Sequence, residues 1–281
     1  MKLGVFTVST PDYDLPLAMQ KLAELGYEGL ELRVCEDRGD RSKPGFWSGN
    51  RTSITAGEII ARAAELRALA NRWGLKIPSL GAYVDAADPA AVEEHCQAAA
   101  ALGARSVRIN VGPYDPRHGP YHQQAAAARA RYAVVANIAA RHSVRALLET
   151  HMGQLAPSVA TAMHILQGLN PDHVGIIWDP GNQVYEGLEV YSMALELAGR
   201  YLAEVHVKNA RYVAGEQANG RITWRAVSCP LREGIVDWPA VVAALKAVGY
   251  QGWLFFEDFS TDHPLEERLR DNLVWFRELL G

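Results

Sequence analysis

The chain has 281 residues, of which 49% are hydrophobic and 21% charged, a composition typical of a globular protein with a large buried core. Its formal charge of −4 at pH 7 argues against nucleic acid or an anionic membrane as the partner, because such partners bind a basic face. Length does not decide the number of domains, because α/β barrels of about 250 residues fold as one.

The first residues lead into a strand-like segment without a long apolar stretch or a small-residue cleavage site. We therefore expect no signal peptide and a cytoplasmic protein. Cys35, Cys96 and Cys229 lie far apart and form no CxxC pair, which is typical of reduced thiols rather than a disulfide framework.

A short apolar segment followed by a loop and an Ala/Leu-rich segment of helical period recurs along the chain. The predicted strands are residues 3–8, 29–34, 77–84, 106–111, 145–150, 174–179, 203–208 and 252–258. The predicted helices are residues 15–25, 56–73, 90–102, 123–141, 158–169, 188–199, 238–248 and 265–280. Several helices end at glycine, as helix C-caps do.

Strict alternation of strand and helix predicts parallel strands joined by right-handed crossovers, and eight such units close into a barrel. We therefore predict a (β/α)8 TIM barrel that forms one domain over residues 1–281. The alternative is an open doubly wound sheet, which lacks support because no GxGxxG follows the first strand. Two long loops, 35–53 and 209–236, follow strands, so we expect them at the catalytic face as lids or substrate walls.

Ionisable residues lie at or near the ends of four successive strands that are otherwise apolar: Glu149, Asp179, His206 and Glu257. Because side chains alternate along a strand, all four are expected to point inward at one end of the barrel. Three carboxylates in one dry place repel each other unless a cation compensates them. We therefore predict one divalent metal ion at this point. Mostly oxygen ligands without thiolate suit Mn²⁺ or Mg²⁺, and Co²⁺ and Zn²⁺ are also compatible.

Each of these residues alone has a structural alternative, such as capping a turn or lining the barrel in a salt bridge, and only the set of four favours the metal. Lys208 shares a strand face with His206, so we expect it to reach substrate oxygens; the alternative is a salt bridge to Glu204. Glu31 and Arg33 also share a face, and we expect them to form an ion pair that supports the metal ligands.

Five segments together resemble the xylose isomerase-like barrels, the sugar phosphate isomerase/epimerase superfamily with the ketose 3-epimerases, inosose dehydratase and endonuclease IV. They are Glu149-Thr150-His151, Trp178-Asp179-Pro180-Gly181-Asn182, His206-Val207-Lys208-Asn209, residues 230–238 and residues 252–257. The resemblance covers essentially the whole chain. It implies that Glu149, Asp179, His206 and Glu257 hold the metal, and that Glu149 and Glu257 also move the substrate's proton.

Two positions depart from the family pattern. Asn182 stands where many relatives have a histidine, and Arg232 stands where the first glycine of a Gly-x-Gly is expected. The three-zinc site of the nuclease branch is therefore incomplete. The family resemblance also implies a homodimer or a homotetramer.

The function that we expect is a metal-dependent isomerase or epimerase of a keto sugar or sugar derivative, which transfers a proton through a metal-stabilised enediolate with two glutamates. The candidates for substrate binding are Lys208, His151, Arg211, Asn182 and Trp47. One alternative is a dehydratase of a cyclic keto-polyol such as an inosose. An endonuclease IV-like hydrolase and a non-catalytic binding barrel are less favoured.

Overall fold

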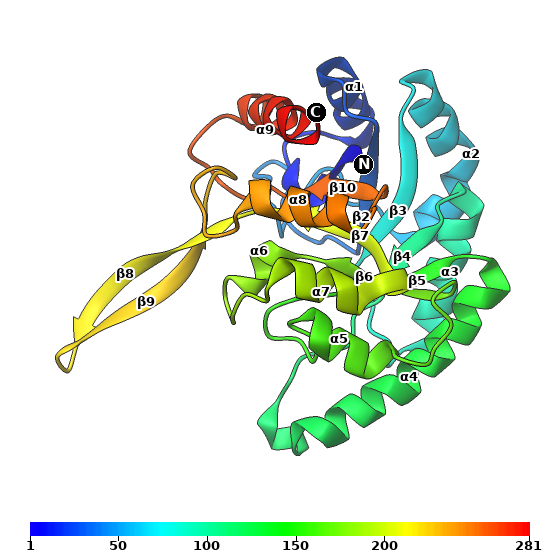
Figure 1. Ribbon diagram of the computed structural model, residues 1–281. Helices are drawn as coiled ribbons and strands as arrows, with labels where there is room; N and C mark the ends of the chain where they lie inside the picture. Colours follow the sequence, from blue (N-terminus) through cyan, green and yellow to red (C-terminus); the bar gives the residue numbers. More distant parts are fainter.

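Eight parallel strands close into a barrel, and helices surround it (Figure 1). This computed structural model describes residues 1–281, with the side chain of residue 218 left out. Around the barrel the strands follow the order β1, β10, β7, β6, β5, β4, β3 and β2. Their bounds are β1 (Lys2–Phe6), β2 (Gly29–Val34), β3 (Lys76–Ala82), β4 (Ser106–Arg108), β5 (Arg145–Glu149), β6 (Val174–Trp178), β7 (Leu202–Val207) and β10 (Trp253–Phe256). The predicted (β/α)8 barrel is confirmed.

Helices cover the outside of the barrel, and each predicted helix has a counterpart. The α-helices are α1 (Leu15–Leu25), α2 (Ala56–Arg72), α3 (Pro89–Leu102), α4 (Tyr121–His142), α5 (Val159–Leu166), α6 (Pro180–Gln183), α7 (Tyr191–Ala198), α8 (Trp238–Ala247) and α9 (Leu265–Leu280). Short 3-10 turns lie at Thr7–Ser9, Pro116–His118 and Gly199–Tyr201. None of the described helices combines the length and the apolar character needed to span a bilayer.

Local signals fix where the helices begin and end. Thr55 and Glu58 form a capping box at the start of α2, in which each side chain bonds the other's backbone N–H. Gly26 ends α1 with φ of 99°, a left-handed conformation that glycine adopts without strain. Several strands end earlier than predicted, because the chain turns at the mouth of the barrel. Asp179, for example, is the N-cap of α6 rather than the last residue of β6.

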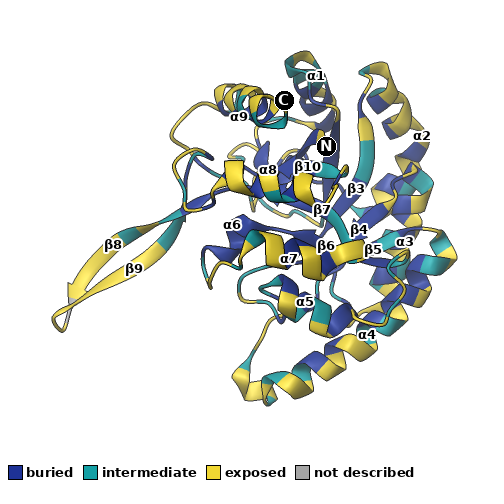
Figure 2. Ribbon diagram, in the orientation of Figure 1, coloured by how far each residue is buried: buried dark blue, intermediate teal, exposed yellow. Residues whose placement is uncertain are grey.

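The main core fills the space between the strands and the inner faces of the helices, which Figure 2 shows as dark blue. On α4, for example, Ala128, Tyr132, Val135 and Ala139 are buried, at the three- and four-residue spacing of one helix face. Each fully buried Leu, Ile or Val stabilises the fold by roughly 1.5–3 kcal/mol. This rigid shell holds the strand ends, and therefore the residues on them, in fixed positions.

The region after β7, predicted as one long loop over residues 209–236, contains two further strands. β8 (Ala210–Ala218) and β9 (Arg221–Ser228) pair antiparallel and project away from the barrel (Figure 1). The turn between them has positive φ at Asn219 (52°) and Gly220 (72°), the conformation of a tight two-residue hairpin turn. Asn-Gly between residues of alternating polarity is a strong hairpin signal, so this hairpin could have been predicted from the sequence.

Glu204 lies on β7 toward the lower end of the barrel and is only 3% exposed. Its Oε2 atom has no hydrogen-bond partner among the described residues. Burial, together with the nearby charge of Glu31, raises the pKa of Glu204 to about 8. The folded protein therefore holds a proton on this group at pH values where the unfolded chain has released it.

The Glu204→Gln variant should make the stability of the metal-free protein less dependent on pH. The stability contributed by the raised pKa is complete below the ordinary value of 4.5 and is lost as the pH rises toward 8. In this window the wild-type free energy of unfolding should fall by up to about 1.4 kcal/mol per pH unit because of this group. Urea unfolding across the window measures the slope, with Glu278→Gln on the exposed side of α9 as control. Equal slopes for wild type and Glu204→Gln would contradict the assignment.

Candidate metal centre

Four side chains from successive strand ends meet at the top of the barrel: Glu149, Asp179, His206 and Glu257. Each offers one ligand atom, and these atoms all lie within 4.8 Å of one another. All four residues are buried, with exposed fractions between 0% and 5%. The inward geometry expected from strand alternation is therefore present. A buried group of this composition can hold a divalent metal ion.

His206 has its two ring nitrogens in different surroundings. Nδ1 faces the group, 3.1 Å from Glu149 Oε1 and 3.5 Å from Glu257 Oε1. Nε2 lies on the other side, 2.9 Å from Glu31 Oε2. A carboxylate that accepts a hydrogen bond from one ring N–H leaves the other nitrogen free to bind a metal. Glu31 therefore orients His206 for this role.

The predicted ion pair between Glu31 and Arg33 is wrong. Arg33 Nη1 lies 3.0 Å from Asp37 Oδ2, in the long loop after β2. Burial alone would raise the pKa of Asp37, but hydrogen bonds from the backbone N–H groups of Gly39, Gly49 and Asn50 lower it to about 2. Glu31 sits deeper in the barrel and bonds His206, while the longer Arg33 side chain reaches the loop, which it helps to anchor.

Lys208 places a cation between two of the carboxylates. Its Nζ lies 2.7 Å from Asp179 Oδ2 and 2.6 Å from Glu257 Oε2. The alternative pairing with Glu204 is therefore not formed. Burial alone would lower the pKa of Lys208, but the charges of Asp179 and Glu257 raise it, so this side chain stays charged.

Arg108, which the sequence analysis overlooked, lies against Glu149. Its Nη1 atom is 2.7 Å from Glu149 Oε2, and its guanidinium stacks over the ring of Tyr83 at 4.5 Å. Burial works against ionisation, but the charges of Arg108 and His206 hold the pKa of Glu149 well below its ordinary value. The sequence contains a signal for this residue, because Arg108 is a charged residue between the apolar Val107 and Ile109 in the predicted strand 106–111.

Asp179 shows how crowded the negative charges are. Burial, and then the charges of Glu257 and Glu149, raise the pKa of Asp179 to about 7, although Lys208 opposes the shift. The Nδ2 group of Asn182 donates to Asp179 Oδ2 at 2.8 Å and to Glu149 Oε1 at 3.2 Å. A further cation would relieve this repulsion, so the side chains present fit a divalent ion.

Two adjoining hollows, of about 380 and 190 Å³, open above these four residues, and we call them together the upper cavity. The larger is lined by Trp47, His151, Met152, Gly181, Asn182, Tyr185, Lys208, Asn209, Ala210, Ser228 and Phe259. The smaller is lined by Trp47, Tyr83, Arg108, Asn110, Glu149, His151, Gln154, Lys208 and Glu257. Polar and aromatic side chains thus surround the space above the candidate metal position.

Four of the five predicted substrate-binding residues border the upper cavity: Lys208, His151, Asn182 and Trp47. The ring of Trp47 lies 4.8 Å from that of Phe259, so the loop after β2 forms one wall. Arg211 does not line either hollow. It pairs with Glu233 Oε2 at 2.6 Å, near the base of the β8–β9 hairpin.

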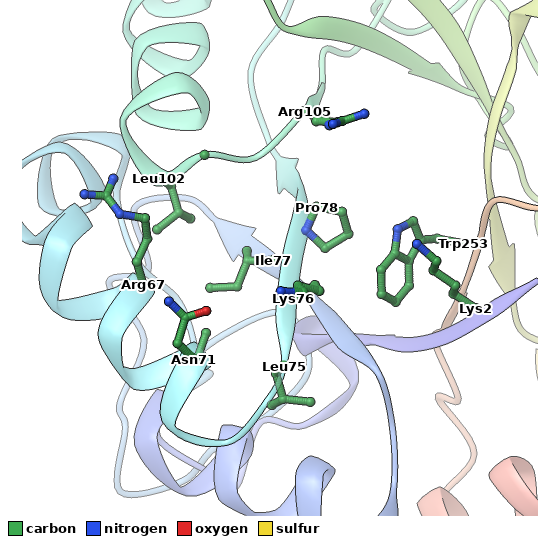
Figure 3. A pocket seen from close by; sticks show the side chains of 12 residues that line it. Lys2, Arg67, Asn71, Leu75, Lys76, Ile77, Pro78, Leu102, Arg105 and Trp253 are labelled. Carbon is green, nitrogen blue, oxygen red and sulfur yellow. The ribbon is translucent and has the colours of Figure 1, made fainter.

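Another hollow, of about 510 Å³, lies at the opposite end of the barrel (Figure 3). Lys2, Arg67, Lys76, Arg105 and Trp253 contribute to its lining. It adjoins the C-terminal ends of α2 and α3, where cations offset the negative end of the helix dipole. Arg67, for example, donates to the carbonyl of Ala101. We interpret these cations as structural, since barrel chemistry occurs at the other face.

Many solved structures and one curated protein are similar to this chain, and three of the structures are described here. A 3-keto-D-glucoside 4-epimerase from E. coli superposes with a TM-score of 0.73 at 18% identity, covering 99% of both chains. D-psicose 3-epimerase from Clostridium cellulolyticum H10 superposes with a TM-score of 0.72 at 16% identity, covering 100% of both chains. A xylose isomerase-like TIM barrel protein from Mycobacterium smegmatis, in complex with magnesium, superposes with a TM-score of 0.71 at 17% identity. The superposition covers 99% of this chain and 96% of the other.

The curated relative is inosose dehydratase from Geobacillus thermodenitrificans, which is 25% identical over 154 residues. That alignment covers 52% of this chain and 51% of the relative, so it spans about half of the relative's length. The family model described as xylose isomerase-like TIM barrel matches residues 19–279. The chain therefore belongs to the xylose isomerase-like TIM barrel family.

Proposed function

We propose that this protein is a divalent-metal-dependent isomerase or epimerase of a keto sugar or sugar derivative. The observation that carries the proposal is the pair of buried glutamates, Glu149 and Glu257, which face the same point at the floor of the upper cavity. Two carboxylates so placed can remove a proton from a substrate carbon and return it. The names of the E. coli and C. cellulolyticum structures, both sugar epimerases, support this class of reaction.

Glu149, Asp179, His206 and Glu257 would hold one ion, for which we propose Mn²⁺. Mg²⁺ is also compatible with these ligands, and the M. smegmatis structure is a complex with magnesium. When bound, the ion would polarise a substrate carbonyl and offset the negative charge that develops on its oxygen. Glu31 would keep the Nδ1 atom of His206 available by accepting a hydrogen bond from the Nε2–H group.

The surroundings of the two glutamates differ, which is consistent with opposite roles in one proton transfer. Arg108 keeps Glu149 ionised, so this carboxylate is ready to accept a proton at neutral pH. Glu257 is 2.6 Å from the ammonium group of Lys208, which also lines both hollows. Lys208 can therefore donate a hydrogen bond to a substrate oxygen. Trp47 and Phe259 limit the access of water from above.

The substrate that we propose is uncharged. Arg108 and Lys208 are the two lysine or arginine side chains that line the upper cavity, and both already pair with carboxylates. A phosphate group would need a free cation or an arginine fork, whereas the hydroxyl groups of a sugar suit Asn110, Asn182 and His151. Aromatic rings such as that of Trp47 provide a flat apolar surface for the carbon face of a sugar ring.

A second candidate is a dehydratase of a cyclic keto-polyol, which the match to inosose dehydratase favours. This reaction begins with the same proton removal but ends with loss of a hydroxyl group from the neighbouring carbon. An endonuclease IV-like activity has less support, because Asn182 replaces a histidine and its amide already bonds Asp179 and Glu149.

Deuterium exchange tests the proposed proton transfer. Protein stripped of metal and protein reloaded with Mn²⁺ are incubated in D₂O with neutral ketoses, keto-acids, sugar phosphates and inososes. We expect metal-dependent uptake of deuterium at carbon with a neutral keto compound. Glu149→Gln and Glu257→Gln should each lower the exchange rate by at least about a hundredfold, because each removes a proton-transfer group.

The metal content of each variant must be measured, since both glutamates are also proposed ligands. Glu233→Gln, which changes an exposed partner of Arg211, is the matched control and should leave exchange unchanged. The product then separates epimerase, isomerase and dehydratase. If one ion binds per chain and no compound exchanges, the proton-transfer proposal fails for these substrates.

Lys208→Met should bind Mn²⁺ more tightly, by about tenfold or more, which corresponds to at least about 1.4 kcal/mol. In the metal-free protein the ammonium group pairs with Asp179 and Glu257, and in the metal-bound protein it repels the ion beside these carboxylates. Its removal therefore favours metal binding for both reasons. Isothermal titration calorimetry measures the affinity, with Lys246→Met on the exposed side of α8 as control. Weaker binding in Lys208→Met would instead indicate that this lysine positions the ligands.

A further inference from the structure

The β8–β9 hairpin, residues 210–228, projects from the barrel as an exposed ribbon, and we call it the arm (Figures 1 and 2). Its two faces differ in character. Ile222 and Trp224 lie on one face of β9, while Arg221 and Arg225 lie on the other. On β8, Tyr212 shares the face of Trp224, since its partner across the ribbon is Ala226. The arm therefore has one apolar and one basic face.

The apolar face of the arm is uncovered. Trp224 is 62% exposed, Ile222 55% and Tyr212 45%. Alternation of apolar and polar residues is the pattern of a sheet that is buried on one face and solvated on the other. An isolated two-stranded ribbon is also at best marginally stable. The sequence of the arm thus fits a ribbon whose apolar face packs against a further surface.

A matching apolar surface lies on the segment 184–198, which includes α7, and we call it the receiving surface. Val190, Met193 and Leu197 share one side of α7, at 65%, 55% and 45% exposure. Arg221 and Arg225 point away from such a contact, because they lie on the other face of the arm.

The arm cannot cover the receiving surface of its own chain. Near its base, the hydroxyl of Tyr212 donates to the carbonyl of Val184, so the arm touches only the start of this segment. Its outer part, with Ile222 and Trp224, extends away from the barrel and from α7 (Figure 1). We propose that the arm docks on the receiving surface of a second copy of this chain, and that two copies exchange arms about a twofold axis.

The area of the arm favours a second copy over an unrelated protein. A ribbon of nine residues is about 30 Å long and, with its side chains, about 10 Å wide, so one face covers about 300 Å². One arm on one partner would bury about 600 Å² in total, which is the size of a crystal contact. Twofold exchange doubles this to about 1,200 Å², the lower limit of specific interfaces.

Analytical ultracentrifugation of the wild type and single variants tests the arm exchange. The wild type should sediment as a dimer at micromolar concentration. Trp224→Glu on the arm and Met193→Glu on the receiving surface should each shift it to the monomer, because each places a charge in the apolar contact. Thr223→Glu, on the basic face of the arm, is the matched control and should remain dimeric.

The mutated side chains are exposed, so the barrel should fold in every variant, and circular dichroism checks this. A monomeric wild type would overturn the proposal. A dimer that persists in both Trp224→Glu and Met193→Glu would place the interface elsewhere and would also overturn it. Loss of the dimer in Thr223→Glu would contradict the assignment of the docking face. None of these outcomes depends on the proposed enzymatic activity.

Discussion

Repulsion between buried carboxylates is the constraint that organises the upper half of the barrel. Glu31, Glu149, Asp179 and Glu257 are each at most 5% exposed and surround one imidazole. Burying such charges costs several kcal/mol each unless cations or hydrogen bonds compensate them. Arg108 and Lys208 supply two positive charges against these four carboxylates, so this compensation is incomplete. A divalent ion would complete it.

The barrel makes this arrangement possible because its strands are held from outside. The helix layer and the apolar core fix the register, so residues at the ends of β5, β6, β7 and β10 meet at one point. Within the barrel, Phe6 and Phe255 fill the space around His206, whose ring lies 5.5 Å from that of Phe6. The imidazole therefore stays between Glu31 below and the candidate ligands above.

The fold and the meeting of the four strand-end residues could be predicted from the sequence, because both follow from periodicity alone. Alternation tells which residues point inward, but it does not tell which inward-pointing charges touch. Lys208 has a long side chain, and its partner Glu257 lies on another strand, at a distance that only the closed barrel defines. Arg33 pairs with Asp37, four residues further on, in a loop whose conformation the strand pattern does not predict. Arg108 was not predicted as a site residue, because alternation alone does not tell that its guanidinium reaches Glu149 on the neighbouring strand. The hairpin, by contrast, was signalled by Asn219-Gly220.

The two long loops border the upper cavity in different ways. The loop after β2 contributes Trp47 and is fixed within the chain. Asp37 accepts hydrogen bonds from the backbone N–H groups of three loop residues and pairs with Arg33. The region after β7 contributes Ala210 and Ser228, the two ends of the arm, directly to the cavity wall. Beyond Tyr212, whose hydroxyl bonds the carbonyl of Val184, the described side chains of the arm make no hydrogen bond or ion pair with the barrel. If a second copy holds the arm, oligomer formation also fixes this wall, and the geometry of substrate binding becomes linked to assembly.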